Sequence, residues 1–323
     1  MTTPEPVGGL RLSVVLPTYR APELLAAALR SLAAQDVAPG MAEIIVVDDG
    51  SPGFDPSPLP GLAAPLPMRS IHFERNRGRA AARNAGIESA RGEVVVFLDG
   101  DMTVRPGFLS AHDAFHRQSP GCAAVGEIRW GPEIPDTALT RYFASRGVAR
   151  FEPGPVPFKC FVTGNSSVPL SILHALGGFD EGLSAYGGED LELGYRLHLH
   201  GVPVHSLPGA RTLHHSWRPL AATCRAMETY GRQSLPRMVD THPDLASVLR
   251  LGFMTRGLLD PRRWLPRMAL WGPLYHGVRW PAERMGSAPW PSILYDYLCW
   301  AGRTRGYLQA RGRDMPSRAG PEG

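Results

Sequence analysis

Short apolar runs alternate with amphipathic or helix-forming segments in the first third of the chain. The helical segments are residues 22–32, with Pro22 in the first turn, and residues 78–92. A Pro/Gly-rich loop is expected over residues 52–67. The apolar runs, which predict buried strands, cover residues 12–19, 43–51, 68–76 and 93–102. This alternation predicts an α/β fold with a mostly parallel, doubly covered sheet.

Three of these predicted strands end in polar residues. The pairs at the strand ends are Thr18 and Tyr19, Asp48 and Asp49, and Asp99 and Asp101. In open α/β sheets, ligands bind beyond the carboxyl ends of the strands. A single aspartate after a strand usually does no more than end it. Three such ends in register favour one shared crevice.

The second half of the chain is less regular. Residues 120–160 predict short strands and loops with many prolines. Residues 163–201 predict a polar turn, a short apolar helix and then a glycine-led helix start at Gly188. From about residue 218 onward the chain is rich in Arg, Pro and Trp and is helical in tendency. We find no internal repeat.

The Asp99-Gly100-Asp101 turn follows the apolar run directly. Two carboxylates one residue apart can hold Mg²⁺ or Mn²⁺, and such a metal neutralises a diphosphate leaving group. Gly100 permits a tight turn and the close approach of a ligand. The tripeptide is common, so its position after the strand carries the interpretation, and a solvated turn is the alternative.

Other charged clusters suggest further roles. Asp48 or Asp49 could accept hydrogen bonds from a nucleobase or a ribose, or could merely close a turn. The arginines from Arg75 to Arg83 lie near a helix N-terminus, which favours phosphate, or else form a basic solvent face. Among the acids of residues 189–192, one could serve as a general base and at least one is structural. His214 is either a metal ligand or a packing residue.

Composition narrows the class of protein. Of the 323 residues, 43% are hydrophobic and 20% charged, as in an ordinary globular chain, and the net charge of +4 predicts no nucleic-acid partner. Four scattered cysteines indicate neither a zinc site nor a disulfide framework, so we expect a cytoplasmic protein. There is no signal-peptide pattern and no apolar run of about 18 residues.

Taken together, six segments resemble the family-2 inverting glycosyltransferases of GT-A fold. They match in order and spacing and lie within residues 10–217, about two thirds of the chain. The segments are residues 14–20, 43–51, 76–87, 92–102, 163–181 and 187–201. The resemblance implies a catalytic domain over residues 10–217, with a nucleotide-binding half to about residue 102 and an acceptor half from about residue 103. We expect residues 1–9 to form a flexible tail and residues 218–323 a mainly helical extension. The composition is typical of a bacterial source.

The resemblance also implies a role for each matched residue. The residues implied to bind the nucleotide are Pro17, Thr18, Tyr19, Asp49, Arg83 and Asp99. The residues implied to ligate Mn²⁺ or Mg²⁺ are Asp99, Asp101 and His214. The residues implied to shape the sugar and acceptor side are Gly164 and Asn165. The implied catalytic base is Asp190, with Glu189 before it.

The implied reaction is a single in-line displacement that inverts the anomeric carbon. The donor is a nucleotide-sugar, with a UDP-sugar favoured. The acceptor is a hydroxyl of a carbohydrate, lipid-linked, peptide or natural-product molecule. The chain lacks the Q-x-x-R-W motif and the transmembrane helices of polymerising members, so we expect non-processive transfer. Residues 218–323 carry no family motif, and they could pack on the catalytic domain, cover the acceptor site, contact the inner face of a membrane, or form a dimer.

Two other classes of protein are weighed against this one. A sugar-1-phosphate nucleotidyltransferase also uses paired acids and a metal, but it needs a glycine-rich loop after the first strand. Here that loop, residues 17–25, has no glycine. A non-catalytic nucleotide-sugar-binding protein would not need Asp99, Asp101 and Asp190, all of which are present.

Overall fold

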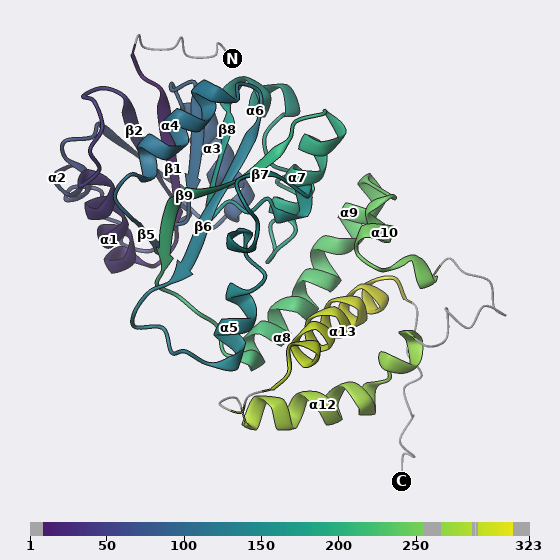
Figure 1. Ribbon diagram of the computed structural model, residues 1–323. Coiled ribbons are helices and arrows are strands. Elements are labelled where there is room, and N and C mark those ends of the chain that lie inside the picture. Colours follow the sequence, from purple (N-terminus) through teal and green to yellow (C-terminus); the bar gives the residue numbers. More distant parts are fainter. Residues whose placement is uncertain (1–8, 255–265, 286–287, 289, 313–323) are drawn as a thin grey trace. The chain divides into compact units, whose positions relative to one another are not determined.

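A nine-stranded mixed sheet lies at the centre of the computed structural model (Figure 1), which describes residues 9–254, 266–285, 288 and 290–312. Residues 1–8 of the expected tail lie outside the described residues. The strand order is β3-β2-β1-β4-β8-β6-β9-β5, and β7 pairs with β9. The strands are β1 (Leu12–Thr18), β2 (Ala42–Asp48), β3 (Met68–His72), β4 (Val94–Leu98), β5 (Met102–Val104), β6 (Ala123–Trp130), β7 (Gly154–Val156), β8 (Asn165–Pro169) and β9 (Val204–His214).

The half of the sheet made by β3, β2, β1 and β4 is wholly parallel, which confirms the α/β expectation for the first third of the chain. The predicted loop over residues 52–67 contains a short helix, α2 (Leu59–Ala63), because Leu59 and Ala63 are buried. Helix α3 ends at Ser89 instead of Gly92. It stops early because the Arg91 and Gly92 backbone N–H groups donate to the Ser13 hydroxyl at the start of β1.

The other half of the sheet is mixed. Strand β8 runs antiparallel to both β4 and β6, and β9 runs parallel to β6 but antiparallel to β5 and β7. Strand β8 occupies the segment expected to be a polar turn. Its serines are fully buried, and the Ser167 hydroxyl contacts ring nitrogens of His112 at 2.8 Å and His116 at 2.7 Å. The Ser167 hydroxyl is therefore satisfied inside the core, which the sequence pattern did not reveal.

Helices cover both faces of the sheet, because alternate strand residues point to opposite sides. Val15, Val95 and Phe97 pack with residues of α3, α6 and α7 in one apolar cluster. Leu16 and Ile44 pack with residues of α1, α2 and α4 in the other. The remaining bounds are α1 (Pro22–Ala33), α3 (Arg79–Ser89), α4 (Phe108–Gln118), α6 (Leu170–Leu176) and α7 (Glu189–Leu199).

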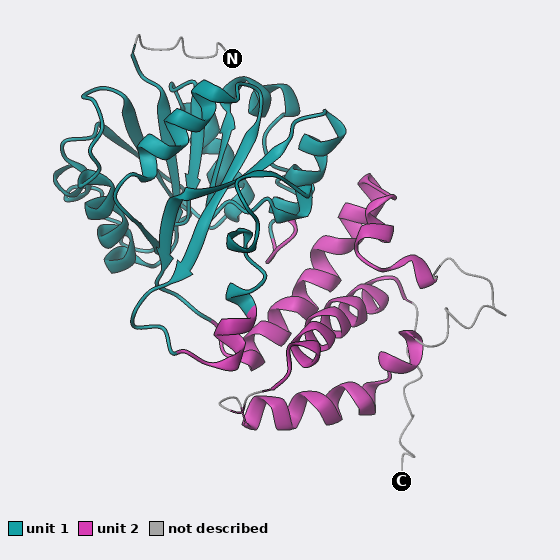
Figure 2. Ribbon diagram, viewed as in Figure 1, with its two compact units in different colours: residues 1–135, 143–184, 189–217 teal, residues 136–142, 185–188, 218–323 magenta. Residues whose placement is uncertain are grey.

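Two compact units divide the chain (Figure 2). Unit 1 holds the sheet, and unit 2 comprises residues 136–142, 185–188 and 218–323. Within unit 2, Glu228 of α8 accepts from the Tyr275 hydroxyl at 3.0 Å and pairs with Arg279 at 2.7 Å, which ties α12 to α8. The helical tendency expected for this region is confirmed. Helix α5 (Ala138–Ala144) begins in this unit, and the others described there are α8 (Leu220–Thr229), α9 (Leu235–Thr241), α10 (Leu245–Val248), α12 (Gly272–Arg284) and α13 (Ser292–Ala310).

None of the helices within the described ranges is both long enough and apolar enough to cross a bilayer.

Candidate functional site

The polar ends of β1, β2 and β4 lie side by side at one edge of the sheet. The Asp49 backbone N–H donates to the Thr18 carbonyl at 2.9 Å, and the Gly100 N–H donates to the Pro17 carbonyl at 3.3 Å. A Cβ atom on Gly100 would lie 2.8 Å from that Pro17 oxygen, so this turn requires glycine. The convergence expected from the sequence is thus present in the fold.

Arg83, in the second turn of α3, is the central cation of this edge. Its side chain is 2% exposed. Nη2 donates to Asp99 Oδ1 at 2.9 Å, and Nη1 donates to Glu189 Oε1 at 3.2 Å and lies 3.8 Å from Asp190 Oδ1. The guanidinium therefore joins the end of β4 to the start of α7. The structure shows Arg83 buried among these carboxylates, and its predicted position beside a bound nucleotide stays a prediction.

The surroundings of Asp190 raise its pKa above the ordinary value for an aspartate. Burial and the negative charge of Glu189 raise the pKa of Asp190 to about 6, although Arg83 and a hydrogen bond from Thr163 act to lower it. That bond runs from Thr163 Oγ1 to Asp190 Oδ1 at 2.7 Å. For Asp99, burial acts to raise the pKa, but the charge of Arg83 prevails and the pKa is lowered. The two aspartates share one cation and have opposite pKa shifts.

Asp101 and His214 face each other across the end of the sheet. His214 Nε2 lies 3.2 Å from Asp101 Oδ2, and the indole of Trp130 stacks on the imidazole with a centroid distance of 5.3 Å. Pairing of β5 with β9 sets this geometry, because Met102 is opposite His214 and the His215 N–H donates to the Asp101 carbonyl.

The three residues predicted to ligate a metal do not form one preassembled cluster in the structure, and their role as ligands stays a prediction. In the part of the chain that the structure describes, no group of three or more His, Cys, Asp or Glu side chains could hold a metal ion. Asp101 and His214 are brought together, whereas one oxygen of Asp99 is taken by Arg83. The sequence could not show this competition, because Arg83 is 16 residues from Asp99 along the chain.

Asp49 contacts the start of α3. One carboxylate oxygen accepts from the Arg77 N–H at 2.6 Å and the other from the Gly78 N–H at 3.0 Å. Burial raises the pKa of Asp49, against the effect of these two bonds. Tyr19, at the neighbouring strand end, is 41% exposed, and its ring is covered on one side by Arg20. Their contacts with a nucleotide stay predictions.

The acceptor-side residues differ in their placement. Gly164 lies beside Asp99 and Met102, close to the carboxylates. Asn165 is fully buried, and its Nδ2 donates to the carbonyls of Glu127 and Ala210 at 3.2 and 2.9 Å. These bonds join β6, β8 and β9, and the role of Asn165 in shaping the sugar and acceptor side stays a prediction.

Two residues of the site were missed from the sequence. Thr163 directly precedes Gly164 in a matched segment, and this position indicates that it lies near the site. Its side chain does not titrate, so its residue type alone does not predict a role there. Trp130 ends β6, which had not been recognised as one long strand.

Comparison with known proteins indicates the class of enzyme to which this site is similar. Residues 13–154 match the model of "Glycosyl transferase family 2", and residues 146–216 match that of "N-terminal domain of galactosyltransferase". The chain is 30% identical over 279 residues to the validoxylamine A glucosyltransferase of Streptomyces hygroscopicus subsp. limoneus. That match covers 76% of this chain and 60% of the relative, so the chain spans less than two thirds of that protein.

Solved structures show the same fold. The mannosyltransferase PcManGT from Pyrobaculum calidifontis, in complex with GDP-Man and Mn²⁺, aligns with a TM-score of 0.58 at 18% identity, covering 98% of this chain and 90% of that one. S. aureus TarS 1–349 in complex with UDP-GlcNAc aligns with a TM-score of 0.56 at 17% identity, covering 94% and 91%. Residues 13–154 thus form a glycosyltransferase family 2 segment, and the chain has the GT-A-like α/β fold.

Replacing Arg83 tests its buried ion pairs. Arg83→Met leaves Asp99 and Glu189 without their cation, so we expect a loss of about 3–5 kcal/mol in the free energy of unfolding at pH 7. Urea denaturation followed by circular dichroism measures this loss. The control is Arg30→Met, at an exposed position of α1, with an expected change within about 0.5 kcal/mol. Equal, small changes in both variants would show that the Arg83 pairs contribute little.

Proposed function

We propose that this chain transfers a sugar from a nucleotide-sugar donor to a hydroxyl acceptor by a single inverting displacement, assisted by a divalent metal. The observation that carries the proposal is the placement of Asp190. Its carboxylate is held by Thr163 and lies beside the same Arg83 that binds Asp99, at the edge where the strand ends converge. Arg83 thus fixes Asp190, the proposed base, relative to Asp99, the acid that we place beside the diphosphate.

Asp190 suits the task of a general base. Such a group works best when its pKa lies near the operating pH. With a pKa of about 6, Asp190 is mostly ionised at neutral pH and still basic enough to take an acceptor proton. Glu189 is buried and bonded to Arg83, so its task is to hold the guanidinium and to raise the basicity of its neighbour.

The residues present fit a divalent metal. Asp101 and His214 supply one carboxylate and one imidazole whose ligand atoms already face the same point. Mg²⁺ and Mn²⁺ commonly take only one or two protein ligands and complete their coordination with water and substrate phosphate oxygens. When bound, the metal would neutralise charge on the departing diphosphate. Asp101 and His214 would hold it, and Asp99, kept ionised by Arg83, would contact the donor ribose or the metal.

The relatives suggest which donors to try first. One matched protein is a validoxylamine A glucosyltransferase. The structural neighbours include one complex with UDP-GlcNAc and one with GDP-Man. We therefore favour a UDP-sugar donor and place natural-product hydroxyls first among the acceptors. Membrane contact or dimer formation through unit 2 stays a prediction.

Asp190→Asn tests the base. The amide cannot take a proton, so we expect kcat to fall by a factor of about 10²–10⁴ while the Kd for the nucleotide changes little. In the unaltered protein, kcat should decline as the pH drops through about 6, because protonation removes the base. Groups that face Asp190 and contribute to this titration are Arg83, Glu189 and Asp99.

Coupled detection of released nucleoside diphosphate measures turnover, and calorimetry measures nucleotide affinity. Asp36→Asn, an exposed acid beyond α1, serves as the control and should behave as the unaltered protein does. Unchanged turnover in Asp190→Asn would exclude Asp190 as the base.

Asp101→Ala tests the metal. Because a carboxylate ligand is lost, we expect the Kd for UDP measured with Mg²⁺ to rise about tenfold or more, with no change in UDP affinity measured in a chelator. Isothermal titration calorimetry gives both values. Full transferase activity of the unaltered protein in the chelator would contradict metal dependence and leave the base assignment standing.

A further inference from the structure

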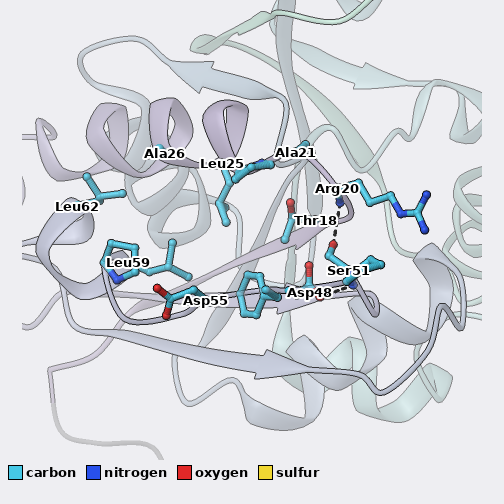
Figure 3. A pocket seen from close by; sticks show the side chains of 15 residues that line it. Thr18, Arg20, Ala21, Leu25, Ala26, Asp48, Ser51, Asp55, Leu59 and Leu62 are labelled. Carbon is cyan, nitrogen blue, oxygen red and sulfur yellow. Dashed lines mark hydrogen bonds between the residues drawn. The ribbon is translucent and has the colours of Figure 1, made fainter.

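A second pocket lies in unit 1 between α1 and the chain from Ser51 to Leu62 (Figure 3). Its volume is about 480 Å³, which lies within the range typical of small-molecule sites. It contains none of the carboxylates that Arg83 binds and neither Asp101 nor His214. Thr18 is the one predicted nucleotide-binding residue among those that line it. The pocket is thus separate from the proposed reaction centre.

The local sequence explains why a pocket exists here. Six prolines fall between residues 52 and 67, and proline disfavours helix continuation. Helix α2 is therefore only five residues long. Leu25 of α1 and Leu59 and Leu62 of α2 line the pocket (Figure 3), and Phe54 of the loop lines it as well. Most of the lining is apolar.

The inner end of this apolar pocket is a buried carboxylate. Asp48 Oδ2 accepts from the Ser51 N–H at 2.7 Å and contacts His72 Nδ1 at 2.8 Å. Asp48 Oδ1 is buried and has no hydrogen-bond partner within the described chain. A buried carboxylate oxygen without a donor is costly, and native proteins rarely leave one so. Figure 3 shows this carboxylate beneath Thr18, at the inner end of the pocket.

The lining carries both signs of charge, and the unpartnered oxygen of Asp48 is the feature that favours a cationic donor. Asp55 is a second acid of the lining and is exposed. Arg20 also borders the pocket, but its guanidinium extends away from the apolar end formed by Leu59 and Leu62 (Figure 3). A hydrogen bond between an ammonium and a carboxylate is about twice as strong as one between neutral groups. A cation would therefore satisfy Asp48 better than a hydroxyl would.

We propose that this pocket is a second ligand site, which binds a compact primary ammonium compound with its apolar body between α1 and α2 and its ammonium group donating to Asp48. Consecutive residues at the end of β2 serve different faces of the sheet. Asp48 faces α1 and α2, whereas Asp49 binds the start of α3. The ammonium site can therefore be occupied independently of the nucleotide.

Benzylamine is a suitable probe, because it joins a single ring to a primary ammonium. Protein-observed NMR titration of the full chain should show saturable binding. Ala26→Phe, which fills the pocket from α1, should raise the Kd about tenfold or more. Ala27→Phe, on the same helix but outside the lining, is the matched control and should leave the Kd unchanged. Benzyl alcohol, with the same ring but no charge, should bind about tenfold more weakly than benzylamine.

Asp48→Asn should weaken benzylamine binding to the level of benzyl alcohol. If that variant does not fold, the comparison of Ala26→Phe with Ala27→Phe still decides the location of the site. Absence of saturable binding, or equal affinity in those two variants, would overturn the site. Equal affinity for the alcohol and the amine would overturn the ammonium assignment. Loss of benzylamine binding in saturating UDP and Mg²⁺ would overturn the independence of the pocket from the nucleotide.

Discussion

The buried guanidinium of Arg83 is the interaction on which the proposed reaction centre depends. A cation in the protein interior is tolerated only when carboxylates and hydrogen bonds compensate for its lost hydration. Here the compensating carboxylates come from the end of β4 and the start of α7. The cation therefore fixes the position of Asp99 relative to Glu189 and Asp190. Asp99 and Glu189, which lie 16 and 106 residues from Arg83 in the sequence, are thereby held in one cluster.

The sheet determines how the rest of the edge is arranged around this cluster. Parallel pairing brings the ends of β1, β2 and β4 together, and the β5–β9 pair sets Asp101 opposite His214. The two aspartates of the cluster differ in their contacts. The Thr163 hydroxyl donates to Asp190, whereas the charge of Arg83 lowers the pKa of Asp99. The same fold produces a different result at Asp48, where a short, proline-limited α2 leaves an apolar pocket over a carboxylate.

The parallel half of the fold could be predicted from the sequence, because its strands are continuous apolar runs that end in polar residues. Strand β8 could not, since Ser166 and Ser167 are buried polar residues, and the partners of Ser167, His112 and His116, lie more than 50 residues away in the sequence. Among site residues, sequence reasoning identified the acids correctly as a group at one edge. It could not show that Arg83 is buried by those acids or that Asn165 bonds to the carbonyls of Glu127 and Ala210, because both contacts depend on long-range packing.

The pKa of Asp190 in the folded protein is the most direct measure of this account. It can be obtained from a ¹³C NMR titration of side-chain carboxyl groups, with the resonance assigned by its absence in Asp190→Asn. The account predicts an apparent pKa of about 6 for Asp190, in which burial and Glu189 outweigh Arg83. An apparent pKa near the ordinary aspartate value of about 4 would contradict it, because Asp190 would then be a weak base with no tuning by its surroundings.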